Sequence, residues 1–234
     1  MHESLRFVVI SDMHGNAVAT RAALNWIDHY GADQIICAGD VANFGPQPNE
    51  VIALLAERDI PCAQGNHDWN FAHAAEVSAP DTPRLEQIHE INAWGLARLN
   101  EASRTWLAGL PFALAPLPEL RVVHAGFESN SQIVTEESEL QFPPGVQIVI
   151  AGHLHKPIKL QSNGYIWANA GSCGRSASGD PRISLAVVER TNADWQVNHV
   201  LLDYDIEASL KTIRDACMPY ADRLIETQIK AAWW

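Results

Sequence analysis

The chain has 234 residues, of which 47% are hydrophobic, so it is long enough to bury a sizeable core. Its formal charge of −12 at pH 7 argues against non-specific nucleic-acid binding, because affinity for a phosphate backbone comes mainly from lysine and arginine. No apolar run is long enough for a membrane span, and the first residues lack a signal-peptide pattern. We therefore expect a cytoplasmic protein without a membrane partner.

Strand-like and helix-like runs alternate in the first third of the chain. Runs rich in β-branched residues at 5–10, 34–40 and 60–68 are separated by helical patterns at 17–30 and 48–59. This βαβαβ order is typical of a largely parallel sheet. Ligands of such sheets gather beyond the carboxyl ends of the strands.

The rest of the chain reads as helices followed by a second set of strands. The segment from about 69 to 110 is rich in Ala, Leu and Trp and is expected to be helical and to lie near the rim of the site. Short strands are expected at 120–126, 145–155, 164–171, 182–190 and 195–205. Residues 206–232 predict a terminal helical segment interrupted near Pro219. No linker divides the chain, so we expect a single domain over residues 1–234.

Polar residues follow each of the first three predicted strands. They are Asp12 and His14, then Asp40, then Asn66, His67 and Asp68. Residues i and i+2 of an extended segment point to the same side, so Asp12 and His14 could converge on one metal ion. An isolated D-x-H has another interpretation, in which Asp12 caps the following helix and His14 lies in a polar loop. The rest of the chain has to decide between the two.

Histidines follow two later strands in a similar way. His124 comes after "LRVV", and His153 and His155 come after "VQIVIAG" with the same i, i+2 spacing. With the earlier residues they make seven candidate ligands: Asp12, His14, Asp40, Asn66, His124, His153 and His155. Imidazole and oxygen donors suit Mn, Fe, Zn or similar divalent ions. Seven ligands are too many for one tetrahedral zinc and suit a pair of ions that share a carboxylate.

Five short motifs occur in a fixed order: "SDMHGN", "GDVANFG", "GNHD", "VVHAG" and "GHLH". This series resembles the D-x-H, G-D-x-x, G-N-H-[DE], H and G-H-x-H motifs of the calcineurin-like metallophosphoesterase superfamily. The stretches "GDVANFGPQPNEV" and "ANAGSCGRSASGDPR" are similar to those of its small bacterial phosphodiesterase-type members. Protein phosphatases of the superfamily carry an Asp-Arg-Gly signature where this chain has "VANFG", which argues against that activity.

The resemblance implies an α/β fold of two mixed β-sheets, packed as a sandwich and flanked by helices, with a two-metal site at the edge. By position, it assigns one ion to Asp12, His14 and His155. It assigns the other to Asn66, His124 and His153, with Asp40 as the bridge. We expect two divalent ions, manganese first, with iron, zinc or nickel as alternatives.

Such a site predicts hydrolysis of a small phosphorylated substrate at a phosphodiester bond, by attack of a hydroxide that bridges the two ions. His67 has no assigned ion, so we expect it to be the acid for the leaving oxygen, with Asp68 orienting its ring. In the alternative interpretation, His67 only makes a hydrogen bond within its loop and has no catalytic role. Ser172 and Arg175 are expected to contact the substrate phosphate. No cluster of arginines is evident, which favours singly charged diesters over dianionic monoesters.

Two rival functions and one structural question stay open. A phosphomonoesterase or nucleotide pyrophosphatase would use the same ions, and scaffold members of the superfamily keep the fold without catalysis. The pair Trp233 and Trp234 could dock on its own domain, dock on a second subunit of a homo-oligomer, or form a disordered tail.

Overall fold

The computed structural model of the protein describes residues 4–74, 81–192 and 194–233. The helices and strands follow one another in the order β1 (Ser4–Ile10), α1 (Ala17–Tyr30), β2 (Gln34–Cys37), α2 (Pro48–Ala56), α3 (Asn66–Ala72), α4 (Pro83–Leu96), α5 (Glu101–Ala108), β3 (Ala113–Leu117), β4 (Leu120–Val123), β5 (Ile148–Ala151), β6 (Pro157–Ser162), β7 (Tyr165–Ala170), β8 (Ile183–Thr191), β9 (Asp194–Leu202), α6 (Ile206–Asp215) and α7 (Ala221–Lys230). A 3₁₀ turn lies at Glu137–Glu139.

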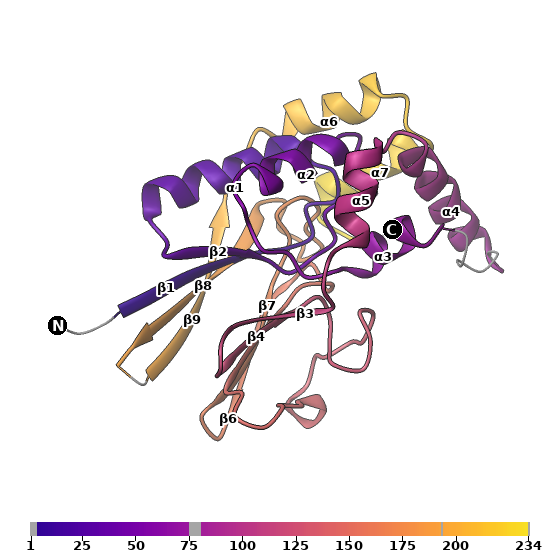
Figure 1. Cartoon of the computed structure of the whole chain (residues 1–234). Helices are drawn as coiled ribbons and strands as arrows, with labels where there is room; N and C mark the ends of the chain where they lie inside the picture. Colours follow the sequence, from indigo (N-terminus) through magenta and orange to yellow (C-terminus); the bar gives the residue numbers. More distant parts are fainter. Residues whose placement is uncertain (1–3, 75–80, 193, 234) are drawn as a thin grey trace.

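The strands form two mixed sheets (Figure 1). The first has the order β2-β1-β8-β9, in which only β1 and β2 run parallel. The second has the order β3-β4-β5-β7-β6, with β4, β5 and β7 parallel and both edge strands antiparallel. This arrangement confirms the predicted α/β fold of two mixed sheets flanked by helices. The third strand expected at 60–68 is reduced to one bridge between Cys37 and Cys62.

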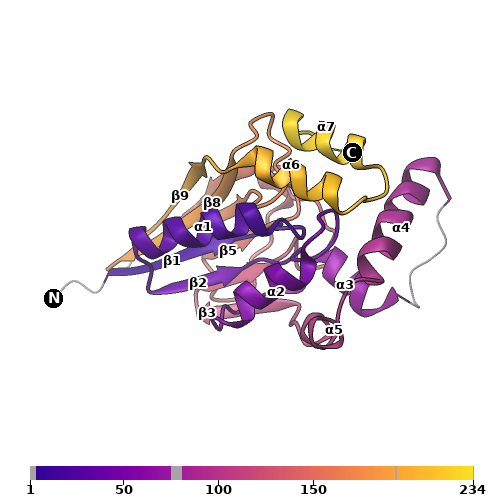
Figure 2. The same ribbon diagram turned by 90° about the horizontal axis from the view of Figure 1, so that it is seen from above.

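Strand β1 is buried on both faces, and its side chains alternate between two cores. Val8 and Ile10 pack with Leu24 of α1 in the core between the first sheet and the helices. Phe7 and Val9 belong to the core between the two sheets. Because successive side chains of a strand point to opposite faces, a strand covered on both sides has an unbroken apolar sequence. Helices α1, α2 and α6 lie over the first sheet (Figures 1 and 2).

The remaining helices gather at one end of the molecule, beyond the carboxyl ends of β1 and β2. Helices α3, α4 and α5 lie in the segment expected to be helical, of which residues 75–80 lie outside the described part. Helices α6 and α7 are separated at residues 216–220, as expected near Pro219. Ile91 of α4, Leu210 of α6 and Leu224 of α7 share one buried cluster, which brings the C-terminal segment beside α4. No helix in the described residues is long and apolar enough to cross a membrane.

Candidate metal centre

The loops after β1 and β2 carry the first three site residues. Asp12, His14 and Asp40 have φ angles of 55°, 47° and 54°, a left-handed conformation that is uncommon for residues other than glycine. The N–H groups of Asp12 and His14 donate to the carbonyl oxygens of Gly39 and Asp40, which locks the two loops together. The extended D-x-H geometry expected from the sequence is therefore wrong, although the side chains do converge. Asn16, not Asp12, caps α1.

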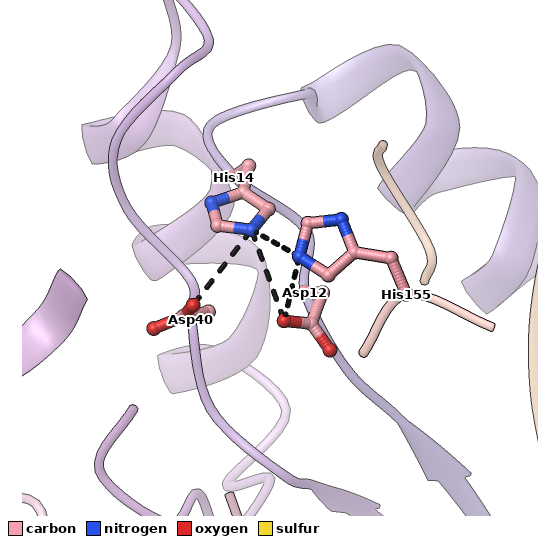
Figure 3. Close-up of side chains that lie close together, drawn as sticks. All are labelled: Asp12, His14, Asp40 and His155. Atoms are coloured by element: carbon pink, nitrogen blue, oxygen red, sulfur yellow. Dashed lines mark hydrogen bonds and ion pairs between the residues drawn. The ribbon is translucent and has the colours of Figure 1, made fainter. Parts of the chain in front are cut away.

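These three side chains meet His155 in a first cluster, which Figure 3 shows in close-up. The donor atoms of Asp12, His14, Asp40 and His155 all lie within 4.8 Å of one another. The Nε2 atoms of His14 and His155 are 2.9 Å apart. Oδ1 of Asp12 lies 3.2 Å from Nε2 of His155 and 3.7 Å from that of His14.

A second cluster adjoins the first. Donor atoms of Asp40, His124 and His153 lie within 4.8 Å of one another. Oδ1 of Asn66, the first residue of α3, lies 3.1 Å from Nε2 of His124 and 3.0 Å from Nδ1 of His153. The two groups suggested by the motifs are thus brought together by five separate loops. All seven candidate ligands lie in one of the two clusters or directly against it.

Asp40 belongs to both clusters. Its Oδ2 atom lies 3.2 Å from Nε2 of His124 in one cluster and 3.8 Å from Nε2 of His14 in the other. Its Oδ1 atom accepts a hydrogen bond of 2.9 Å from the N–H of His67. The resemblance assigned Asp40 as the bridge between the two ions. In the structure one oxygen faces both clusters while the other anchors the backbone of α3.

Backbone contacts orient the imidazole rings. The Nδ1 atoms of His14, His155 and His124 each face a carbonyl oxygen, at 3.3, 2.6 and 2.8 Å from Ala42, Arg175 and Ala38 respectively. A carbonyl can only accept a hydrogen bond, so the proton of each neutral ring belongs on Nδ1. Whenever such a ring is neutral, the lone pair on Nε2 points to the centre of the cluster, as it does in histidines that bind metals.

Before any metal binds, the site holds ionised carboxylates beside a charged His124 and a neutral His14. Burial opposes ionisation of Asp40, but the attraction of His124 holds the pKa of this carboxyl well below its usual range. Burial also opposes the charge on His124, yet the attraction of Asp40 raises the pKa of this ring to about 10. Burial lowers the pKa of His14 well below its ordinary value, which leaves its Nε2 free to bind a cation.

One buried oxygen tests whether these residues fit metal ions. Oδ2 of Asp12 accepts hydrogen bonds from the hydroxyl of Ser11 and the N–H of His153, at 2.6 and 3.0 Å. Oδ1 of Asp12 is buried and receives no hydrogen bond from the part of the chain that the structure describes. A buried carboxylate oxygen without a partner is costly, and the lone pairs of His14 and His155 converge on the same point. A divalent cation would bind all three atoms, so the donor set fits the metal that the motifs imply.

His67 projects beside the two clusters, and the residues around it differ from expectation. Nδ1 of His67 lies 2.8 Å from Nδ2 of Asn43. The carboxylate of Asp68 instead accepts hydrogen bonds from the backbone N–H groups of Asp40, Val41, Ala42 and Gly65, at 2.8 to 3.2 Å. Asp68 therefore holds the loop that carries Asp40. The expectation that Asp68 orients the ring of His67 is wrong, and Asn43 has that position.

The two expected substrate contacts differ in their surroundings. Ser172 is fully buried, and its hydroxyl donates to the carbonyl oxygen of Asp12 at 2.7 Å. Arg175 borders a cavity of about 100 Å³ that is also lined by His14, Asp40, His67, His153 and His155. The ring centroid of Trp233 lies 4.6 Å from that of His155, so Trp233 docks on its own chain at the site. Trp234 lies outside the described residues.

Comparison with known proteins identifies the family. The family model of the calcineurin-like phosphoesterase superfamily domain matches residues 5–193. The chain belongs to this superfamily. Membership implies a metal-dependent phosphoric ester hydrolase, and the match confirms the resemblance drawn from the five motifs.

Individual relatives are similar to this chain over most of its length. An uncharacterized protein of Methanocaldococcus jannaschii is 25% identical over an alignment 233 residues long. The alignment covers 88% of this chain and 90% of the relative. A metallophosphoesterase from Sphaerobacter thermophilus has a similar structure, with a TM-score of 0.81, 24% identity, and coverage of 98% of this chain and 100% of that one. A hypothetical protein from Pyrococcus horikoshii OT3 has a TM-score of 0.79 at 16% identity, with coverage of 96% and 97%. At these identities the two structures establish the fold alone.

Proposed function

We propose that the protein hydrolyses phosphodiester bonds of small phosphorylated molecules with two divalent ions, manganese first among them. Asp12, His14 and His155 are the proposed ligands of one ion. Asn66, His124 and His153 are the proposed ligands of the other, and Asp40 joins the two. When bound, a pair of divalent cations acidifies water and neutralises the non-bridging oxygens of a phosphoryl group. The observation that carries the proposal is the oxygen Oδ2 of Asp40, which faces His14 and His124 at once.

His67 is the proposed partner of the leaving oxygen. Its half-buried ring lines the same cavity as the proposed ligands and is not needed to hold an ion. Burial lowers the pKa of His67 to about 4, so the ring is neutral at pH 7. Because Asn43 occupies Nδ1, the ring can donate from Nε2. We therefore propose that His67 stabilises the departing oxygen by a hydrogen bond from Nε2, and that Asn43 holds the ring for this task.

The charge around the cavity favours a second candidate function. The preference for diesters rests on the resemblance to small bacterial phosphodiesterases and on the lack of an arginine cluster in the sequence, yet Arg84 and Arg175 both line the cavity. Two guanidinium groups could neutralise the two negative charges of a phosphomonoester, just as they could neutralise those of a different anion. Phosphomonoester hydrolysis is thus the rival that a specific observation supports. A scaffold role has less support, because every proposed ligand and His67 are present together in one site.

A substrate panel separates these functions. The protein is loaded with Mn²⁺, Zn²⁺, Ni²⁺ or Mg²⁺ and assayed with bis(p-nitrophenyl) phosphate, p-nitrophenyl phosphate and dinucleotides. We expect the diester to have the higher kcat/KM with Mn²⁺. A much higher kcat/KM for the monoester would favour the phosphomonoesterase. The absence of hydrolysis with every metal and substrate would favour the scaffold. Asp40→Asn serves as the control for a contaminating enzyme, because it should remove the activity.

A further inference from the structure

Two arginines from distant parts of the chain border the cavity next to the metal centre. Arg84 is the second residue of α4, and Arg175 follows the strand β7 and the turn after it. Ile88 of α4 and Trp233 also line the cavity. Four of the proposed metal ligands, His14, Asp40, His153 and His155, line it together with His67. We call the part formed by the ligands the metal side of the cavity and the part formed by the two arginines the arginine side.

Arg175 is buried, and no described residue supplies it with a counter-ion. Only 6% of its surface is exposed, and its buried Nε atom has no hydrogen-bond acceptor among the described residues. Its guanidinium lies over the ring of Phe44, 4.4 Å from the centroid, and one NH₂ group lies 3.4 Å from the hydroxyl of Thr227. Within the described residues, no carboxylate lies within ion-pair distance of Arg175. Burying an unpaired charge is costly, so an unpaired arginine at a cavity wall is unusual unless an anion binds there.

Arg84 adds a second positive charge to the same wall. It is exposed, and no salt bridge joins it to a carboxylate of the described residues. Burial, and then the nearby charge of Arg84, lower the pKa of Arg175 to about 10, so Arg175 remains charged at pH 7. Two like charges that face one cavity repel each other when it is empty. An anion between them would remove this repulsion and supply the missing acceptor.

We propose that Arg84 and Arg175, the arginine pair, form a subsite for a second anionic group of the substrate, while the scissile phosphoester lies on the metal side of the cavity. The substrate class is then a phosphodiester or phosphoanhydride that carries another phosphate or a carboxylate a few bonds from the scissile phosphorus. This inference rests on the proposed function, because it needs the scissile group at the metal ligands. It also explains why a site specific for diesters would contain two arginines. The scissile diester carries one negative charge, and the arginine pair neutralises the charge of the second anionic group.

The test uses phosphonates that cannot be hydrolysed. Binding of methylphosphonate, ethylenediphosphonate, propylenediphosphonate and phosphonopropionate to the Mn²⁺-loaded protein is measured by calorimetry. The first ligand has one anionic group, the second and third have two phosphoryl groups, and the last has a phosphoryl group and a carboxylate. We expect at least one ligand with two groups to bind about tenfold or more tightly than methylphosphonate, since an added charge-assisted contact has this magnitude. Comparison of the propionate with the diphosphonates identifies which anion the subsite prefers.

Variants decide whether the arginine pair causes the preference. Arg84→Gln should abolish it and leave the affinity for methylphosphonate and the manganese content unchanged. Arg98→Gln is the matched control, because Arg98 lies beyond the end of α4 and its guanidinium lies over Trp94, 3.7 Å from the ring centroid. Arg175→Gln is measured with its melting curve, since the residue is buried.

The subsite is refuted if Arg84→Gln weakens the binding of methylphosphonate as much as that of the longer ligands. It is also refuted if Arg84→Gln leaves the preference for ligands with two anionic groups intact. Binding is measured without turnover, so a protein that shows the preference but hydrolyses nothing would refute the proposed function alone.

Discussion

The side-chain nitrogen Nδ2 of Asn43 lies 2.8 Å from Nδ1 of His67, and this contact determines which ring nitrogen carries the proton. Oδ1 of Asn43 accepts a hydrogen bond of 2.8 Å from the N–H of Phe44, so turning the amide over would break that bond. The amide therefore donates to Nδ1 of His67. A neutral ring in this position has its proton on Nε2.

Nitrogen NMR of the metal-free protein tests this tautomer. We expect His67 to be neutral at pH 7 with the proton on Nε2, and to remain neutral until the pH falls toward 4, because burial lowers its pKa to about 4 from an ordinary value of 6.5. The stability linked to this group is present above pH 6.5 and is lost as the pH falls through about 4, since the unfolded state takes up the proton first. Asn43→Leu should mix the tautomers. A ring that is charged at pH 7 would contradict the assignment.

Replacing His67 by asparagine tests its role at the leaving oxygen. With an alkyl diester, whose alkoxide leaves poorly, we expect His67→Asn to lower kcat about 10²–10⁴-fold, the usual range for such a group. With a nitrophenyl ester the loss should be much smaller, because nitrophenolate leaves unaided. Metal content should not change. His73→Asn, at the end of α3, is the control. Equal losses for both esters would make His67 a residue that positions the substrate.

Asp40→Asn tests the shared ligand. An amide has no charge and one good ligand oxygen, so we expect loss of ions from both clusters and loss of turnover. Elemental analysis after gel filtration gives the metal content. Asp28→Asn, which breaks an exposed ion pair with Arg58, should leave both quantities unchanged. Two tightly bound ions in Asp40→Asn would show that this carboxylate does not join the two sites.

Gly65→Ala tests the packing behind Asp40. A Cβ atom on Gly65 would lie 2.1 Å from Oδ1 of Asp40 and 2.3 Å from its backbone nitrogen, so the carboxylate would have to move. We expect weaker metal binding and lower activity, measured by metal competition and by the diester assay. Gly109→Ala is the matched control, because its Cβ would have no neighbour closer than 3.6 Å and its φ is −85°. Unchanged metal affinity in Gly65→Ala would contradict the geometry.

The sequence was informative wherever a residue sits in a motif at the end of a strand. The seven proposed ligands could be named because their types and order are set by a local pattern, and a buried strand such as β5 has an unbroken apolar run. The site's convergence was predicted for the wrong local reason, since Asp12 and His14 lie in left-handed turns instead of an extended segment. Backbone pairing between two loops sets this conformation, and no local pattern encodes it.

Residues that reach the site through tertiary packing were not predicted. Arg84 lies in a helix that reads as an ordinary surface helix, and it lines the cavity only because α4 packs on α6 and α7. Asn43 had one weak signal, its place three residues after Asp40 in the same motif. Asp68 was assigned to His67 because the two are adjacent in sequence. In α3 its carboxylate instead caps the N–H of Gly65 and those of the neighbouring loop.

Titration of the metal-free protein with Mn²⁺ tests the central claim most directly. Bound manganese per chain and the rate of hydrolysis of bis(p-nitrophenyl) phosphate are measured in the same samples. We predict that activity is absent without metal and rises to a plateau when two ions are bound per chain, with neither quantity recovered in Asp40→Asn. Full activity with one bound ion, or two bound ions without hydrolysis of any phosphoester, would contradict a two-metal phosphoesterase.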